Sequence, residues 1–236
     1  MRSSIVLLIA LVFAMSEFSC KRKGDKYIDQ GEIHYNIEYI GRFTYPTEAL
    51  PHNLIVSFKD NKILFEMTGI GNSGISNLTN PKEGIYDTYY SFFNVKRYYY
   101  AGKEGETFPG FEAMKGMNIK KTQKTAVICG YNCKNAQVTF ERDRNKVYEI
   151  WYTDEIDVEN PNECTPFSEV DGVLLRFFFI MGNSELHFSA ETVYNKDVPE
   201  HKFQRKDHYL RVSKKDITAL MNGMVERSPG EPSLRQ

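Results

Sequence analysis

The sequence predicts a mostly β fold of the α+β class: one large curved antiparallel sheet, or half-barrel, with a C-terminal amphipathic helix covering one face. Three observations lead to this prediction. At least seven segments alternate apolar and polar residues at hairpin spacing. Residues that favour strands are abundant, with 15 Tyr and 16 Phe. The strand segments do not alternate with helical ones, as they would in a parallel sheet.

Each predicted strand has one face that is more apolar than the other. In the first, isoleucine and tyrosine at odd positions oppose histidine, asparagine and glutamate at even positions. Residues 60–61 and 142–145 are polar turn sequences that join two pairs of strands into hairpins. The predicted strands are residues 33–39, 54–58, 63–67, 136–140, 148–152, 173–180 and 186–194.

Residues 69–116 show weaker periodicity. The glycine-rich stretch 69–74 is expected to form a hairpin loop. Aromatic residues gather in 86–100, which favours two strands that add to the core. The alternative is an aromatic surface that stacks sugars or lines an apolar groove.

One segment near the end of the chain has helical periodicity. Ser213 and Asp216 resemble a capping box at its start. The apolar residues that follow share one helical face: Ile217, Leu220, Met221, Met224 and Val225. This helix is predicted to pack on the sheet; the alternative is a helix that binds a partner or a membrane surface.

The first residues have the pattern of a secretory signal peptide. Arg2 precedes an apolar run over residues 5–15. A helix of that length rises only ~17 Å, too short to span the hydrocarbon core of a bilayer. A small residue, Ser19, then precedes Cys20, which resembles the lipobox of bacterial lipoproteins, although Glu17 and Phe18 depart from the strict pattern.

Cys20 is therefore the candidate lipidation site, with its acyl chains (palmitate among them) inserted in a membrane. The alternative is an ordinary signal peptide cut near Ser19. The expected organisation is a signal peptide (1–19), a lipidated cysteine and tether (20–30), a single β-rich domain (31–226) and a flexible tail (227–236).

Composition and motifs argue against several functions. The formal net charge of −1 gives no electrostatic reason to bind nucleic acid. The five histidines are scattered, and neither a nucleophile elbow nor a phosphate-binding loop is present, so we expect no enzyme, no cofactor and no metal site. In an exported protein one disulfide is expected, Cys133–Cys164 or Cys129–Cys164.

Three motifs resemble a known family. Residues 128–136 read Ile-Cys-Gly-Tyr-Asn-Cys-Lys-Asn-Ala, 151–156 read Trp-Tyr-Thr-Asp-Glu-Ile, and 171–175 read Asp-Gly-Val-Leu-Leu. This set is similar to uncharacterised Bacteroidetes envelope lipoproteins related to the GLPGLI family. The resemblance implies a LolA/LolB-like fold, a half-barrel wrapped around helices that can hold acyl chains. Gly130 within the first motif suits a bulge or a positive φ.

Two functions follow as hypotheses. The first is a non-catalytic lipoprotein of the cell envelope, most simply on the periplasmic face of the outer membrane, that binds a lipid, acyl chain or peptide in its concave face. The alternative is a structural or interaction subunit that docks to an outer-membrane protein without a ligand. The candidate ligand-lining residues are Ile37, Tyr39, Val56, Phe58, Phe65, Tyr148, Tyr152, Phe177 and Phe188.

Overall fold

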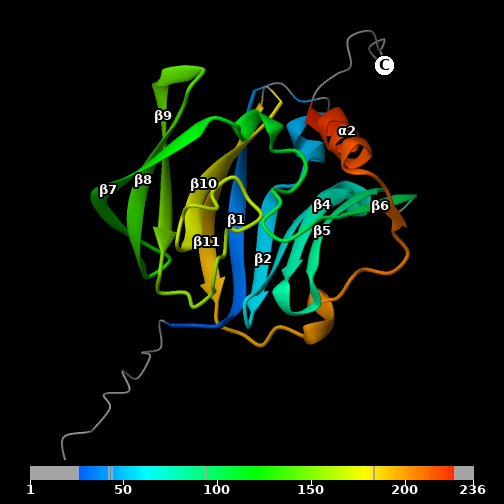
Figure 1. Ribbon diagram of the computed structural model, residues 1–236, viewed down its shortest axis with the longest axis horizontal. Coiled ribbons are helices and arrows are strands. Elements are labelled where there is room, and N and C mark those ends of the chain that lie inside the picture. Colours follow the sequence, from blue (N-terminus) through cyan, green and yellow to red (C-terminus); the bar gives the residue numbers. More distant parts are fainter. Residues whose placement is uncertain (1–26, 42, 44, 94, 183, 226–236) are drawn as a thin grey trace, which may run out of the picture.

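The computed structural model describes residues 27–41, 43, 45–93, 95–182 and 184–225. Within them the chain forms one large curved, unclosed sheet of twelve strands with a single α-helix at its C-terminal end, α2 (Lys214–Val225) (Figure 1). The predicted fold class is confirmed. Cys20, the predicted signal peptide and the predicted tail lie outside the described residues.

The strand order is β12-β6-β5-β4-β3-β2-β1-β11-β10-β9-β8-β7. Strand β1 lies between β2 and β11, so it joins the two halves of the chain in one sheet. All neighbours are antiparallel except β12 and β6. The strands are β1 (Gln30–Ile40), β2 (Asn53–Lys59), β3 (Lys62–Thr68), β4 (Gly74–Asn80), β5 (Ile85–Phe92), β6 (Lys96–Ala101), β7 (Met117–Ile128), β8 (Tyr131–Phe140), β9 (Asp143–Thr153), β10 (Val173–Met181), β11 (Ser184–Tyr194) and β12 (Leu210–Arg211).

Two tight turns show how the sequence sets the strand register. Asp60 and Asn61 both have positive φ, at 46° and 65°, between β2 and β3. Cys129 and Gly130, at 51° and 83°, form the turn between β7 and β8. Two successive positive φ angles match the right-handed twist of a hairpin. The positive φ predicted at Gly130 is confirmed.

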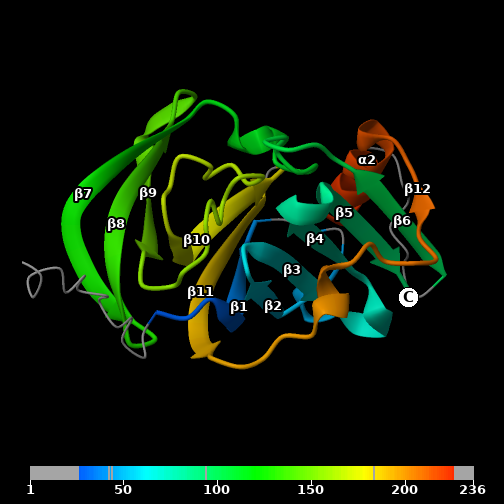
Figure 2. The same ribbon diagram turned by 60° about the horizontal axis from the view of Figure 1, so that its bottom comes forward.

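The hollow of the sheet is filled by what we call the cover: residues 102–116, residues 154–172 and helix α2 (Figure 2). Phe167 of the cover is fully buried, and its ring lies between 5.8 and 6.4 Å from three consecutive phenylalanines of β10. The ring of Phe111 lies 4.4 Å from that of Phe179. Most of the core is therefore packed between the sheet and its cover.

Helix α2 begins as its sequence indicates. The Ser213 hydroxyl donates to Asp216 at 2.6 Å and accepts from the Asp216 backbone N–H at 3.2 Å. Ile217 and Met221 are buried on the face toward the sheet. The helix contacts β5 and β6, which confirms that it packs on the sheet. Among the described residues, no helix has the length and hydrophobicity needed to cross a bilayer.

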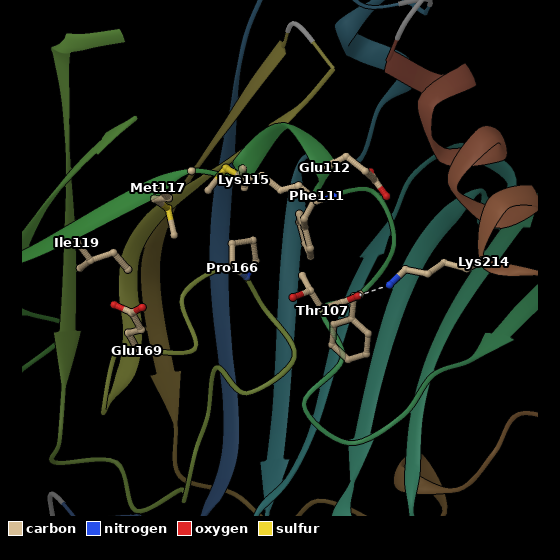
Figure 3. A pocket seen from close by; sticks show the side chains of 12 residues that line it. Thr107, Phe111, Glu112, Lys115, Met117, Ile119, Pro166, Glu169 and Lys214 are labelled. Carbon is tan, nitrogen blue, oxygen red and sulfur yellow. Dashed lines mark hydrogen bonds between the residues drawn. The ribbon is translucent and has the colours of Figure 1, made fainter. Parts of the chain in front are cut away.

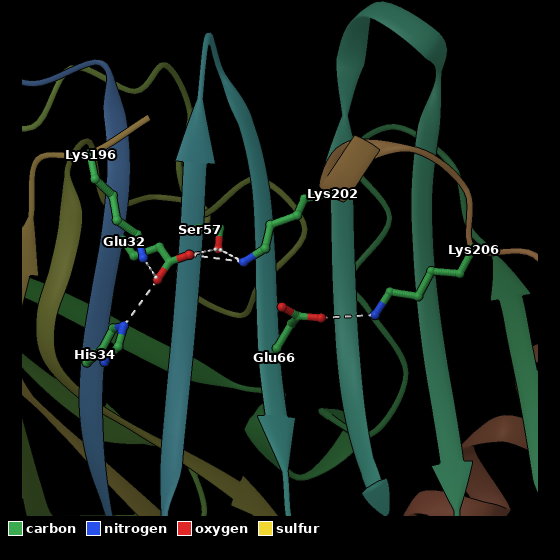
Figure 4. A network of polar contacts seen from close by, with 7 residues as sticks. All are labelled: Glu32, His34, Ser57, Glu66, Lys196, Lys202 and Lys206. Carbon is green, nitrogen blue, oxygen red and sulfur yellow. Dashed lines mark hydrogen bonds and ion pairs between the residues drawn. The ribbon is translucent and has the colours of Figure 1, made fainter. Parts of the chain in front are cut away.

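A second layer lies on the convex side of the sheet. Residues 195–209, which we call the strap, run across the outer faces of β1 to β6 (Figure 2). Val198 and Phe203 of the strap are fully buried and form a separate apolar cluster with Leu64, Leu78, Ile85 and Tyr89 of the sheet. Figure 4 shows the polar contacts beside this cluster, where Lys196 and Lys202 reach the Glu32 carboxylate at 2.7 and 3.0 Å.

Candidate functional site

A groove with a volume of about 320 Å³ lies at the mouth of the concave face. It lies between the two irregular segments of the cover, the start of β7 and the start of α2 (Figure 3). This size is at the lower end of the range for small-molecule sites. Its lining residues are Thr107, Phe108, Phe111, Glu112, Met114, Lys115, Gly116, Met117, Ile119, Pro166, Glu169 and Lys214.

The apolar wall of the groove comes from a short stretch of chain. Phe108, Phe111 and Met114 belong to the cover, and the chain then enters β7 with Met117 and Ile119 on the same side of the groove. The cover can lie this close to α2 because of Gly110. Its φ is 93°, and a Cβ there would lie 2.7 Å from the terminal methyl of Met221.

The polar rim of the groove contains both signs of charge. Lys214 donates to Glu106 at 2.7 Å and to the Thr107 carbonyl at 3.0 Å. Burial alone would raise the pKa of Glu106, but the hydrogen bonds from Lys214 and Tyr100 lower it, so the carboxylate is ionised. Lys115, by contrast, makes no ion pair or side-chain hydrogen bond with any residue that the structure describes.

Three much smaller cavities, each of about 20 to 30 Å³, lie on the concave side of the sheet, and two of them lie beneath the cover. Each holds roughly one water molecule at most. The first lies against β1, β2, β3 and β10, the second at the upper ends of β1 and β11, and the third between them, under Phe108 and Phe111. The concave face is thus filled by protein rather than hollow.

The predicted ligand-lining residues come together, although not at the groove. Seven of the nine belong to the core cluster, and the other two, Tyr39 and Phe65, are partly buried and pack against it. Val56, Phe58, Phe65 and Phe177 line one small cavity, and Tyr39 lines another. The remaining four line none of the four cavities found in the described part of the chain: Ile37, Tyr148, Tyr152 and Phe188.

The residues of the groove were not predicted from the sequence. Most of them lie in irregular backbone, for which apolar periodicity gives no signal. The only local sign is the sequence Phe108-Pro109-Gly110-Phe111, in which two aromatic residues flank a proline and a glycine. This pattern predicts a turn with two buried rings and does not by itself predict a groove.

The three described cysteines are free thiols, so neither of the two expected disulfides is present in the structure. Cys133 is buried in β8 against Cys129 and Tyr35, whereas Cys164 lies in the cover near Glu106. Either predicted disulfide would have to join a cysteine at the β7–β8 hairpin to Cys164 in the cover. Burial raises the pKa of the Cys133 thiol to about 11 and that of Cys164 to about 12, so both are protonated at neutral pH.

One compact cluster of titratable side chains outside the groove lies on β9 and β11. Glu185 accepts hydrogen bonds from Tyr148 at 2.8 Å and from Lys146, and it lies 3.0 Å from His187. None of the four cavities adjoins it. In the part of the chain that the structure describes, no group of three or more His, Cys, Asp or Glu side chains could hold a metal ion.

No family model and no curated protein matches the sequence. Two solved structures of PNGF-II, in space groups C2 and P21, are 17% and 18% identical to this chain, with TM-scores of 0.51 and 0.52. They match 82% and 81% of this chain but only 32% and 33% of their own. The chain thus spans about a third of the length of PNGF-II, and at this identity the likeness concerns the fold alone.

Two further structures align over most of their length but less closely. The lipoprotein LppX of Mycobacterium tuberculosis is 11% identical, with a TM-score of 0.32, over 72% of this chain and 89% of its own. LprF of Mycobacterium bovis is 10% identical, with a TM-score of 0.27, over 75% of this chain and 89% of its own. Scores this low do not establish a common fold. The relation to GLPGLI and LolA/LolB-like proteins stays a prediction.

Proposed function

We propose that this protein is a non-catalytic envelope protein that binds an amphipathic ligand with an apolar portion, such as a lipid, an acyl chain or an apolar peptide segment. The observation that supports this most is the groove at the mouth of the concave face. Its wall of aromatic rings and thioethers offers apolar surface, and Lys115 at its rim is a cation without a partner in the described chain. The binding position differs from the deep concave site that the sequence suggested.

Binding of a fluorescent fatty acid, cis-parinaric acid, to the purified protein tests this proposal. We expect saturable binding with one site per chain, competed by palmitic acid. Ile119→Glu places a charge in the apolar wall and should weaken binding at least tenfold. Val127→Glu is the matched control, because Val127 is 68% exposed on the same strand and lies outside the groove. Absence of saturable binding to the unmodified protein would refute the proposal.

The place of action is proposed from Cys20. Acylation of this cysteine would hold the domain at a membrane, and we propose the periplasmic face of the outer membrane. Metabolic labelling with an alkyne analogue of palmitate should mark the unmodified protein and leave Cys20→Ser unlabelled. The substituted protein should also leave the membrane fraction. Labelling that persists in Cys20→Ser would contradict this assignment.

The alternative is an interaction subunit that binds no ligand, and one surface feature favours it. Tyr45, Ile70, Phe93 and Val95 are exposed by 39% to 82%. They gather where the β5–β6 turn meets residues 70–72, since the Phe93 backbone N–H donates to Ser73 and the Phe93 ring lies against Gly71. A pull-down from the cell envelope tests this alternative. It would be favoured over ligand binding if one envelope protein is recovered in stoichiometric amount, if Val95→Asp abolishes that recovery, and if Val127→Asp retains it.

A further inference from the structure

The four cavities are connected through the residues that line them. Phe108 and Phe111 line both the groove and the central small cavity. Phe65, Thr165 and Phe179 are shared between the central cavity and the first one. The central cavity also shares lining residues with the one at the upper ends of β1 and β11: Met67, Ile75 and Met181. The central cavity therefore adjoins the groove and both of the other small cavities, and we call the three small cavities together the seam.

Flexible side chains close the seam. Met67, Met181 and Met221 stand at the central cavity. A thioether side chain has three rotatable bonds and fills irregular space, so it can change its position at low cost. Met67 and Met181 lie between the central cavity and the one at the upper ends of β1 and β11, and they are among the side chains most easily displaced by another apolar chain.

The central part of the cover is held to the sheet by apolar contact. The Phe108 N–H donates to the Cys164 carbonyl at 2.9 Å, and the Phe111 carbonyl accepts from Met114. The Thr107 carbonyl accepts from Lys214. All of these hydrogen bonds join one part of the cover to another. Movement of residues 107–111 away from β10 would thus break none of these hydrogen bonds if the rest of the cover moved with them, whereas Met114 accepts a hydrogen bond from the Ile180 N–H of β10 at 3.2 Å.

We propose that the ligand of the groove is a single unbranched acyl chain with an anionic head, and this rests on the proposed function. The head binds at Lys115, and the tail passes Phe108 and Phe111 into the seam. From the groove, a linear chain can enter the central cavity and continue past Met67 and Met181 by moving methionine side chains. A rigid fused-ring molecule would instead have to lift the whole cover from the sheet.

Binding of a series of saturated fatty acids from eight to sixteen carbons, each below its micelle concentration, tests this inference. A tail that enters the seam buries every added methylene, so the Kd should improve by about fourfold per methylene across the series. A tail confined to the groove should stop gaining affinity at the shorter chains. The matching alkylamines should bind more weakly than the acids, and Lys115→Glu should reverse that preference.

A pair of variants tests the path itself. Met181→Phe overfills the seam where two of its cavities meet, and it should weaken binding of the sixteen-carbon acid at least tenfold while leaving the eight-carbon acid nearly unchanged. Ile85→Phe is the control, because Ile85 is as deeply buried but lies in the apolar cluster beneath the strap. It should lower stability by a similar amount and leave both affinities unchanged.

The outcomes separate this inference from the proposed function. Tight binding without chain-length dependence, and unaffected by Met181→Phe, would overturn the seam and leave the groove as the site. Preference for the alkylamines would overturn the assignment of Lys115. If no fatty acid binds at any length, the proposed function fails together with the inference.

Discussion

The two faces of the sheet are covered in opposite ways. On the concave face, apolar side chains hold the cover, and two small cavities lie beneath it. The ion pairs of the cover are partly exposed: Lys121–Asp171, Lys134–Asp154 and Lys214–Glu106. On the convex face, a short strap is held by a compact apolar cluster and a row of ion pairs: Lys59–Asp197, Lys62–Glu200, Lys196–Glu32, Lys202–Glu32, Arg205–Asp87 and Lys206–Glu66.

This difference indicates which of the two layers, the cover or the strap, can move relative to the sheet. A charged hydrogen bond requires fixed geometry, and breaking a buried one leaves an uncompensated charge. Asp87 is fully buried and accepts two hydrogen bonds from Arg205, at 2.7 and 3.1 Å. Apolar contacts have no preferred direction, so the cover can move while it stays in contact. The strap is held to the sheet by directional contacts, and the cover is the part that we propose admits a ligand.

The largest expected effect is the loss of an aromatic ring from the strap. Phe203→Ala should reduce the free energy of unfolding by about 3–5 kcal/mol, because the fully buried ring has no adjoining cavity into which the cluster could relax. Phe111→Ala in the cover should reduce the free energy of unfolding by less, about 1–3 kcal/mol, because the flexible methionines near the ring can fill part of the space that it leaves. Urea unfolding measures both. Equal losses would contradict the contrast between the two faces.

The second effect is a pH dependence that originates on the convex face. Burial alone would raise the pKa of Glu32, but hydrogen bonds from Lys196, Lys202 and His34 lower it from 4.5 to about 2. Because the folded pKa lies below the unfolded one, this stabilisation is complete above pH 4.5 and is lost as the pH falls toward 2. It amounts to about 3 kcal/mol at most.

Glu32→Gln should remove that part of the acid sensitivity, measured as the free energy of unfolding between pH 2 and pH 7. Glu38→Gln is the control on the same strand, since Glu38 is exposed and makes no ion pair among the described residues. A Glu32→Gln protein with the same pH profile as the unmodified one would show that the network does not fix the strap.

A third and smaller effect concerns the rate of local opening. Cys164 in the cover is 2% exposed, and Val198 in the strap is fully buried. Both test proteins have Cys129 and Cys133 changed to serine. One keeps Cys164, and the other combines Cys164→Ser with Val198→Cys. Iodoacetamide should label Cys164 in the first about tenfold faster than it labels the new thiol in the second, because the cover opens more often than the strap. Faster labelling of the strap would reverse the comparison.

Most of the sheet could be predicted from alternating apolar and polar residues, but β4 was not predicted, because its buried positions include the polar residues Asn77, Thr79 and Asn80. The segments now seen as β1, β2, β3, β8, β9, β10 and β11 all showed period-two alternation, and the aromatic stretch 86–100 forms β5 and β6 as expected. Strand β7 was not predicted, because no residue along it is buried and its centre reads Lys-Lys-Thr-Gln-Lys-Thr. An edge strand with charged side chains gives no alternation to detect.

The cover could not be predicted from the sequence, for a different reason. Residues 102–116 and 154–172 contain little regular structure, and their positions depend on contacts far away in the sequence, such as Phe111 with Phe179. The nine predicted lining residues do share the concave core, because alternation identifies a face. Alternation says nothing about what fills the space above that face, so the groove at Lys115 and Ile119 emerged only from the structure.

The central claim is that the concave cover, and not the convex strap, moves to admit an acyl chain. Amide hydrogen exchange of the purified protein, with and without saturating palmitic acid, tests it most directly. We expect the ligand to slow exchange in residues 102–116 and 160–170 and to leave residues 195–209 unchanged. Unchanged exchange throughout the cover, or a response confined to the strap, would contradict the claim.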